Sequence, residues 1–440
     1  MTGASLAPAP GGLPLVGHAL AFLRDKPGFL AASLRQHGDC VRLDLGGPTW
    51  LLNDPADVKH VLVDAAAKYQ KTPKLTSSRG RELSGEGLHT SNGAEHLQLR
   101  RLLQPLFQRR AIEAHAGLVS DVAARHLDRW RPGETRDLWS EMLELTQQVL
   151  LRVLFGPSFV DSGGELAAAV TARRSYIEHF FLSNLPSPEL WPLPVVLRYR
   201  KARRHIHRVI DAEVARRRRE GAAGDDWVSR LVASSWSDGR PLSDRQIRDE
   251  VITLTSTGYE TVASALTWMG HLLSHHPEVQ EALRAEVPPP GGSPGPFMTQ
   301  VVNEALRLYP PTWLFVRVAV GEDVLPGGAE IRVGDKCYLS PYTMHRHPRW
   351  YARPDQFDPG HFAEEAVRER PRLAFFPFGG GARQCIGEPF ARLEANLVMN
   401  ELLRRVRLEP VRPLQVPLRA AIVLEPRGGL PIRLARTGSG

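Results

Sequence analysis

Cysteine is scarce in this chain. Only Cys40, Cys337 and Cys385 occur among its 440 residues, and they lie far apart. No two of them have the CxxC spacing, so the sequence predicts neither a zinc site nor a framework of disulfide bonds. Any metal chemistry would therefore have to depend on a single cysteine.

Long apolar runs are absent as well. None approaches the roughly 20 consecutive apolar residues that a bilayer-spanning helix requires. The start, Met1 to Pro10, is small and rich in proline, without the basic and apolar segments of a signal peptide. We expect a cytoplasmic protein with no transmembrane anchor and with flexible ends at 1–13 and 434–440.

Acidic residues are outnumbered by basic ones, which gives a formal charge of +8. Arginines gather at 198–208 and 216–219. No aromatic residues are interleaved there for stacking on bases, so we interpret these clusters as solvated helix faces and expect no nucleic-acid binding. A basic surface that docks an acidic protein remains a further interpretation.

The spacing of apolar residues predicts a mostly helical chain. Residues 40–52 alternate around a Gly-Gly-Pro turn, which is typical of a β-hairpin. The clearest helix is expected over 244–275, because apolar residues recur there with the helical period. Ser243 and Gln246 predict a capping box at its start, and Pro277 ends it.

The other elements follow from the same signals. Helix is expected through most of 95–276, with loops at 131–135, 184–195 and 221–226, then a helix at 298–308, strands within 315–342, a final helix at 386–405 and strands beyond 406. We see no internal repeat and no linker. The sequence therefore predicts one mainly α-helical (α+β) domain over 1–440, with a smaller β-rich region.

The decapeptide FGGGARQCIG at 378–387 is the most informative stretch. Its three glycines let the backbone approach a flat ligand closely. Cys385 directly precedes a predicted helix, whose N–H groups and positive end favour a thiolate. Arg383 is able to pair with a carboxylate of the ligand. The alternative is a buried cysteine that acts as a small hydrophobic residue in a tight turn.

This decapeptide resembles the haem-binding loop of the cytochrome P450 superfamily, FxxGxRxCxG, and the resemblance covers nearly the whole chain. Every fixed position is matched, by Phe378, Gly381, Arg383, Cys385 and Gly387. The resemblance, to soluble bacterial members, implies the P450 fold around a buried haem b with Cys385 as its axial thiolate, a ligand that favours O–O cleavage. It also implies cofactor contacts from Phe378, Gly379 and Gly387.

Glu304 and Arg307 supply the ExxR motif of the family. The i, i+3 spacing places both side chains on one helix face. The resemblance implies a buried ion pair that supports the haem-binding core, with an arginine as its usual third member. His361 occupies that third position here, which leaves open whether it acts as a cation or as a neutral donor.

Four residues resemble the propionate partners of the family, namely His96, Arg100, Arg317 and Arg383. Taken singly, each would be interpreted as a solvated surface residue. As a set, they would supply three positive charges and one hydrogen-bond donor to the two haem carboxylates.

Gly258 lies midway along the long predicted helix. A glycine there costs about 1 kcal/mol relative to alanine, so it needs a reason, either close helix packing or, by resemblance, room beside iron for dioxygen. The resemblance also implies that Thr261 hydrogen-bonds the bound oxygen and that Glu260 belongs to the proton route. Thr257 and Val262 depart from the family pattern. The acid–alcohol pair implies a monooxygenase that activates O₂.

Substrate contacts are carried over from the family by position only, to 74–92, 176–197, 254–261, 312–316 and 420–424. The residues expected to line the pocket are Leu254, Thr257, Phe180, Phe181, Trp313 and Phe315. Ordinary core packing is the equal alternative for the aromatic residues. We expect hydroxylation or epoxidation of a lipophilic secondary metabolite such as a terpenoid or polyketide.

Electrons are expected from a separate ferredoxin or flavodoxin with its reductase, because nothing after Arg433 could hold a flavin. A docking face is expected at Arg100, Arg101, Arg109 and Arg110, and the protein is expected to be a monomer. Two alternatives remain open. One is a peroxygenase or isomerase of the same fold, and the other is a non-catalytic haem protein that senses or carries a ligand.

Overall fold

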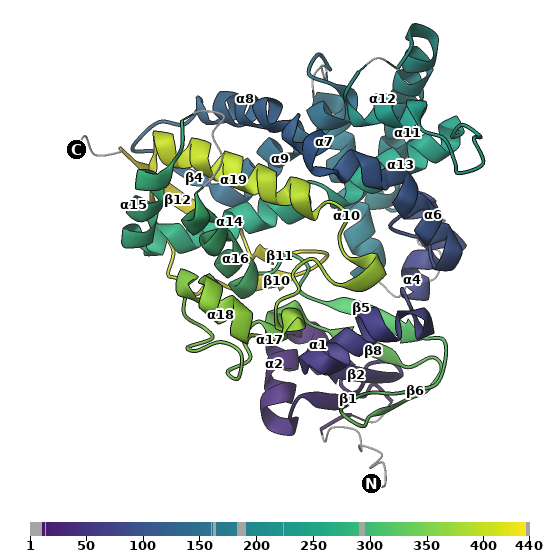
Figure 1. The fold of residues 1–440 in the computed structure, drawn as a ribbon, viewed down its shortest axis with the longest axis vertical. Helices are drawn as coiled ribbons and strands as arrows, with labels where there is room; N and C mark the ends of the chain where they lie inside the picture. The colour runs from purple at the N-terminus through teal and green to yellow at the C-terminus, as the bar shows by residue number, and fades with distance from the viewer. Residues whose placement is uncertain are drawn as a thin grey trace.

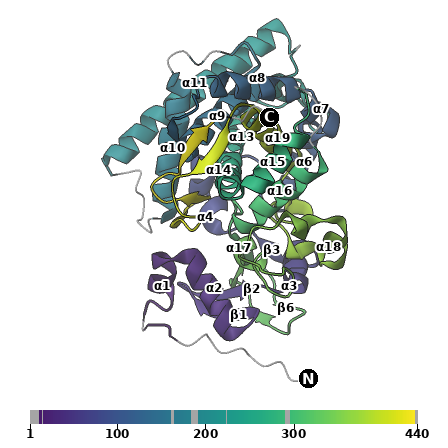
Figure 2. The ribbon, with the colours of Figure 1, turned by 90° about the vertical axis from the view of Figure 1, so that its left-hand side faces the viewer.

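The computed structural model describes residues 11–436, apart from 14, 160, 162–163, 183–190, 223 and 290–294. Helices gather in one part of the molecule and most strands in another, beside the N-terminal helices, as Figures 1 and 2 show from two directions. This arrangement confirms the expected mainly helical (α+β) class. The predicted flexible ends lie outside the described residues at 1–10 and 437–440. Residues 434–435, which the prediction placed in the flexible tail, form the end of a strand.

The main sheet has five strands in the order β1-β2-β8-β5-β3. Its strands are β1 (Cys40–Asp44), β2 (Pro48–Leu52), β3 (Tyr69–Gln70), β5 (Phe315–Ala319) and β8 (Lys336–Leu339). β1 and β2 pair antiparallel with Arg42 opposite Trp50, as the hairpin prediction requires. The turn between them uses Gly46 and Gly47 at positive φ, a conformation that favours glycine.

Smaller sheets complete the β structure. One pairs β4 (Thr135–Asp137), β12 (Pro431–Ala435) and β9 (Arg407–Pro410), and two hairpins pair β6 (Asp323–Val324) with β7 (Glu330–Ile331) and β10 (Leu418–Ala420) with β11 (Leu424–Pro426). Leu434 is fully buried and lies opposite Leu408, which explains why order continues beyond 433.

The helices of the larger region are α6 (Gly93–Leu103), α7 (Arg109–Glu113), α8 (Ala116–Leu127), α9 (Leu138–Phe155), α10 (Glu165–Leu182), α11 (Pro194–Glu220), α12 (Trp227–Ala233), α13 (Asp244–Thr257), α14 (Glu260–His275), α15 (Pro277–Glu286), α16 (Pro296–Leu308) and α19 (Glu388–Arg405). Those near the main sheet and its loops are α1 (Ala19–Arg24), α2 (Lys26–His37), α3 (Pro55–Lys59), α4 (Pro73–Thr76), α5 (Ser78–Ser84), α17 (Pro341–Met344) and α18 (Glu364–Glu369). Helix α19 begins two residues later than predicted, with Gly387 at its N-cap.

The prediction of one unbroken helix over 244–275 is wrong at its middle. The capping box of Ser243 and Gln246 is present, but α13 ends at Thr257 and α14 begins at Glu260. At the break, the Thr257 carbonyl accepts the Thr261 hydroxyl at 3.1 Å, and Thr146 of α9 donates to the Tyr259 carbonyl at 3.1 Å. Both carbonyls at the break thus accept side-chain hydroxyl groups.

The main core lies around α14. Buried apolar residues of α9, α14, α16 and α19 form one continuous cluster, with Leu145, Leu266, Leu306 and Leu402 among its members. Burial of this face holds the two halves of the broken helix in place. Within the described part of the chain, no helix is long and apolar enough to cross a membrane.

Candidate active site

The cysteine loop lies between the β-rich region and the start of α19. Its conformation is fixed by backbone hydrogen bonds. The Cys385 N–H donates to the Phe378 carbonyl at 2.8 Å, and the Gln384 N–H donates to the Gly381 carbonyl at 3.1 Å. These bonds close the segment into a tight loop that places Cys385 directly before the helix.

Two glycines of the loop are required by its geometry. Gly379 and Gly381 have φ of 74° and 66°, where other residues are strained. A Cβ on Gly381 would lie 2.1 Å from the Leu62 carbonyl oxygen, and one on Gly379 would contact the Phe315 ring at 3.4 Å. For these two positions the close approach is to protein neighbours, a reason that the sequence interpretation did not include.

The side chain of Cys385 is accessible to solvent, although protein surrounds it. Burial raises the pKa of its thiol, while N–H groups of Gly387 and Glu388 and the Arg100 guanidinium act to lower it. Cys337, by contrast, is fully buried, and burial and nearby carboxylates raise the pKa of its thiol further. Cys385 therefore faces an internal space and is the cysteine suited to hold a metal as thiolate.

Three cations gather beside this loop. Arg317 is 8% exposed, and burial and Arg383 lower its pKa to about 10. Burial, Arg383 and Arg317 together lower the pKa of Lys71 to about 7. Among the described residues, none of the three forms an ion pair with a carboxylate. Such a cluster suits a ligand that brings its own carboxylates.

The sequence interpretation missed Lys71. It lies in a stretch without a recognisable motif, and only the fold brings it to the cations of the cysteine loop. Its Nζ donates to the carbonyls of His89 and Leu88, at 2.7 and 3.2 Å.

His96 and Arg100 of α6 contact the backbone of the cysteine loop. The Arg100 guanidinium donates to the Gln384 carbonyl at 2.6 Å, and a ring nitrogen of His96 lies 3.4 Å from the Ala382 carbonyl. Burial and the charges of Lys71 and Arg383 lower the pKa of His96 to about 4, so its imidazole is neutral near pH 7. Both side chains therefore hold the loop in position.

Glu304 and Arg307 form the expected buried ion pair. Both side chains are fully buried, and two bonds of 2.7 Å join the guanidinium to the two carboxylate oxygens. Arg307 also donates to the carbonyls of His345 and Gln356, which ties α16 to the irregular segment before the cysteine loop. The surrounding donors hold the pKa of Glu304 below its usual range despite burial.

His361 completes this group. Its Nδ1 lies 3.1 Å from Oε1 of Glu304, and its Nε2 lies 2.6 Å from the Ala352 carbonyl oxygen. His361 therefore occupies the third position of the ExxR group and links Glu304 to the Ala352 carbonyl.

Glu260 and Thr261 lie at the start of α14, but they have different partners. The Thr261 hydroxyl donates to the Thr257 carbonyl, while Glu260 lies 3.1 Å from Nε of Arg174 and accepts the Tyr259 hydroxyl at 3.1 Å. Burial raises the pKa of Glu260, and Arg174 opposes that shift. Arg174 in turn pairs with Glu178 and Glu425, and Arg419 contacts the same two carboxylates, so the group joins α10 and α14 to the β10–β11 hairpin.

The geometry does not support room for dioxygen on the side-chain side of Gly258. A Cβ there would lie 3.2 Å from Leu150 Cδ1 on α9 and 2.8 Å from the Leu254 carbonyl oxygen. This glycine is therefore explained by the close approach of two helices. Close helix packing was the alternative given by the sequence, and a role for Gly258 beside the iron stays a prediction.

A family model for cytochrome P450 matches residues 7–430. The chain belongs to the cytochrome P450 family. It is similar to cyclooctatin synthase of Streptomyces melanosporofaciens, with 35% identity over 418 residues that cover 92% of this chain and 90% of the relative. It is also similar to pentalenene oxygenase of Streptomyces avermitilis, with 34% identity and 95% of each chain covered.

Solved structures share this fold. A retinoic acid-bound cyanobacterial P450 matches with a TM-score of 0.87 and 24% identity, covering 98% of this chain and 99% of its own. A 6-coordinated cytochrome P450 from Thermus thermophilus matches with a TM-score of 0.75 and 29% identity, covering 94% and 99%. The enzyme is thus a P450 monooxygenase with a haem cofactor held by a cysteine thiolate, as the sequence predicted.

The residues predicted to line the substrate pocket of this P450 have different surroundings in the structure. Phe315 lies against Gly379 of the cysteine loop, and Leu254 belongs to the main core at the edge of α13. Trp313, however, is 5% exposed, packs in a separate cluster and donates its Nε1–H to the Ala421 carbonyl at 3.1 Å. Its indole N–H is used inside the fold, and the assignment of Trp313 to the pocket stays a prediction.

The aromatic segment within 176–197 is partly outside the described residues. The side chains of Phe180 and Phe181 belong to that undescribed part, as do residues 183–190. Tyr176 is fully buried and stacks on Tyr199 of α11, with ring centroids 4.1 Å apart. At Tyr176 the core-packing alternative is therefore the right one.

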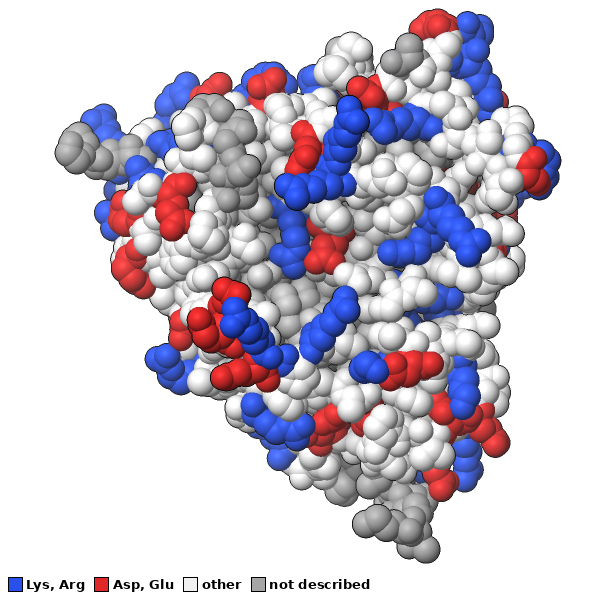
Figure 3. Space-filling model, viewed as in Figure 1, with Lys and Arg blue, Asp and Glu red and all other residues white. Residues whose placement is uncertain are grey.

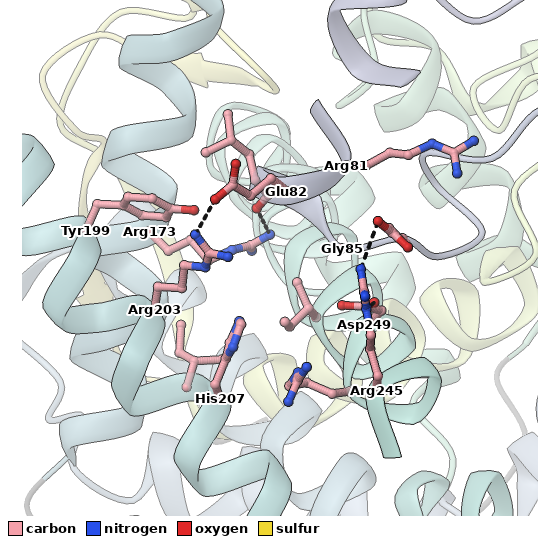
Figure 4. Close-up of a pocket in the computed structure, with 14 residues that line it drawn as sticks. Arg81, Glu82, Gly85, Arg173, Tyr199, Arg203, His207, Arg245 and Asp249 are labelled. Atoms are coloured by element: carbon pink, nitrogen blue, oxygen red, sulfur yellow. Dashed lines mark hydrogen bonds and ion pairs between the residues drawn. The ribbon is translucent and has the colours of Figure 1, made fainter. Parts of the chain in front are cut away.

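A separate polar pocket of about 310 Å³ lies between α5, α10, α11 and α13. Figure 4 shows Arg173 and Arg203 reaching from two helices towards the segment that carries Glu82. Arg203 pairs with Glu82 at 2.7 Å, and Arg173 donates to the Leu83 carbonyl at 2.9 Å. No residue of the cysteine loop lines this pocket, so it is not the cofactor site.

Proposed function

We propose that this P450 oxygenates a lipophilic terpenoid with electrons from a separate redox partner. The observation that carries the substrate class is the similarity to curated terpene-modifying relatives, at 33–35% identity over at least 92% of this chain. One of these relatives is named for a hydrocarbon, pentalenene, and another, cyclooctat-9-en-7-ol 5-monooxygenase, for an alcohol. The relatives therefore support a polycyclic terpenoid skeleton. Because one name refers to a hydrocarbon and the other to an alcohol, they do not decide whether the substrate already carries oxygen.

The residues around Cys385 fit a haem. When bound, the haem supplies the activation of dioxygen, which a thiolate ligand favours. Cys385 would ligate the iron, and its enclosed but accessible sulfur suits this role. Arg317, Arg383 and Lys71 would neutralise the two propionates, which would satisfy three cations that lack carboxylate partners in the protein.

We assign proton handling to Thr261 and Glu260. The Thr261 hydroxyl donates its hydrogen bond to the Thr257 carbonyl. Rotation about the Cα–Cβ bond of Thr261 would turn this donor towards another acceptor. Glu260 contacts Arg174 and Tyr259. It can pass a proton towards Thr261 only when these two contacts break. Since Arg174 belongs to α10, movement of α10 would control access of protons to the site.

We place the docking of the electron donor on the face that carries α6 and α7. Arg101, Arg109 and Arg110 are exposed there, and Figure 3 shows basic side chains on this face interspersed with a few acidic ones. Arg100 is turned towards the Gln384 carbonyl and is left out of the proposed surface. Such a surface attracts an acidic ferredoxin or flavodoxin.

The test is a reconstituted reaction. Purified enzyme, NADPH, a bacterial ferredoxin and its reductase are incubated with a panel of cyclic terpenoids under isotopically labelled dioxygen. We expect a product heavier by one labelled oxygen atom, formed only with the complete electron chain. No oxygenated terpenoid, or equal turnover with hydrogen peroxide and no reductant, would contradict the proposal.

A further inference from the structure

His89 has the same unusual surroundings as Cys385. It lies on the segment between α5 and α6, and its side chain is exposed to a water-sized probe. Protein nevertheless surrounds the ring, and this burial is the main reason why the pKa of His89 is lowered to about 3. A ring that is accessible to water and still enclosed faces an internal space, and its low pKa keeps it neutral.

Two charged neighbours locate that space. Lys71 and Arg173 both act electrostatically on the His89 ring. Lys71 lies beside Arg317 and Arg383 of the proposed propionate site. Arg173 donates to the Ser256 hydroxyl at 2.5 Å, one residue before Thr257 and the break in the long helix. The ring therefore lies between the cofactor side and the oxygen-activating side of the enzyme, where a substrate has to bind.

The backbone around His89 is fixed from several directions. Lys71 donates to the carbonyls of Leu88 and His89, and a carboxyl oxygen of Glu250 on α13 accepts the Leu88 N–H at 3.1 Å. The Thr90 hydroxyl donates to the Gly85 carbonyl at 2.7 Å. A side chain on such a braced segment is pre-organised, so little entropy is lost when it binds a ligand.

The two ring nitrogens of His89 have no hydrogen-bond partner among the described residues. The hydroxyls at the break in the long helix are already used, since Thr257 donates to the Thr253 carbonyl at 3.0 Å and Thr261 to the Thr257 carbonyl. A neutral imidazole offers one donor and one acceptor. A hydroxyl or carbonyl group on the substrate would match either nitrogen.

We propose that His89 binds an oxygen atom already present on the substrate, so that this P450 takes an oxygenated terpenoid in preference to the parent hydrocarbon. The inference rests on the proposed terpenoid function and specifies its substrate class. It also places the reaction after one that installs oxygen, either a cyclisation terminated by water or an earlier oxygenation. His89 would act as a positioning residue that sets which carbon faces the iron.

The experiment compares matched probes, each a cyclic terpene alcohol and the hydrocarbon of the same skeleton, such as cedrol and cedrane. Dissociation constants are measured from the shift of the haem Soret band. One neutral hydrogen bond should make the alcohol bind about tenfold more tightly to the wild type. His89→Phe keeps the planar shape without the nitrogens and should bring the ratio close to one. His89→Asn should retain part of the preference.

His207→Phe is the control, because His207 lines the outer polar pocket on α11 and should leave the ratio unchanged. If His89→Phe does not incorporate haem, His89→Leu takes its place, and the reduced carbonyl spectrum verifies each variant. An unchanged ratio in the His89 variants, or a wild type that prefers no alcohol, overturns the inference. If hydrocarbons and alcohols are bound and oxygenated equally, only this inference fails. If no terpenoid is bound or oxygenated, the proposed function fails with it.

Discussion

The Nδ1 of His361 lies 3.1 Å from Oε1 of Glu304, and its Nε2 contacts the Ala352 carbonyl oxygen, so His361 completes a buried group around Arg307. Arg307→Lys would lose the two-pronged contact and leave buried acceptors unpaired. We expect a loss of about 3 to 5 kcal/mol in the free energy of unfolding, measured by urea titration.

Arg353→Lys is the matched control, because Arg353 pairs with Asp358 at the surface. It should cost less than about 1 kcal/mol. Equal losses in the two variants would contradict the structural role given to the buried group.

Thr261→Ala should uncouple electron consumption from product formation. The hydroxyl that can deliver a proton would be lost, so reduced oxygen would leave as hydrogen peroxide. Coupling is measured as product formed per NADPH consumed. Thr267→Ala removes a buried hydroxyl of the same helix that donates to the Ala263 carbonyl, and it should leave coupling intact. The same coupling in both variants would argue against the role of Thr261.

Glu250 should make the stability of the enzyme depend on pH. It is 1% exposed, and burial raises its pKa to about 8. The pKa in the unfolded chain is about 4.3, so the folded protein binds more protons between these values. Its contribution to stability is therefore complete below the unfolded pKa and is lost as pH rises towards 8.

Glu250→Gln should abolish this loss while keeping an acceptor for the Leu88 N–H. Between about pH 6 and about pH 9, we expect the wild type to lose about 2 to 4 kcal/mol more than the variant. Denaturant titrations at the two pH values measure this difference. Glu82→Gln, at a surface ion pair, serves as control. Parallel pH profiles for wild type and Glu250→Gln would disprove the assignment.

Charge reversal of Arg101, Arg109 and Arg110 to glutamate should slow reduction by an acidic ferredoxin about tenfold at low ionic strength. The difference from wild type should shrink as salt is added, because salt screens long-range attraction. Stopped-flow reduction under carbon monoxide measures the rate. Arg433→Glu, on β12 at another edge of the molecule, should have no effect (Figure 1). A rate indifferent to these charges or to salt would exclude this docking surface.

The sequence was sufficient for features that depend on local spacing. The decapeptide at 378–387 and the Glu304–Arg307 pair have fixed positions along the chain, so the loop and the ion pair could be predicted directly. The capping box at Ser243 was predictable for the same reason, because both of its residues belong to one turn.

Features that depend on tertiary neighbours could not be predicted in this way. Gly258 is explained by Leu150 on another helix, and Trp313 by a carbonyl more than a hundred residues away. Lys71 belongs to no motif, and only the fold brings it to the cofactor side. His89 lies within the 74–92 segment expected from the family to contact substrate, but its enclosed surroundings depend on tertiary neighbours. Each is recognised by its surroundings in the described part of the chain. Lys71 is a cation with no carboxylate partner, and His89 is an enclosed ring with no hydrogen-bond partner.

The central claim is that Cys385 holds the haem iron as a thiolate. The most direct test is the absorption spectrum of the dithionite-reduced protein under carbon monoxide. We predict the strongly red-shifted Soret band of a thiolate-ligated carbonyl in the wild type and in Cys40→Ala, and its loss in Cys385→Ala. A haem-free protein after expression with ample haem, or a band typical of histidine ligation that Cys385→Ala leaves unchanged, would contradict the account.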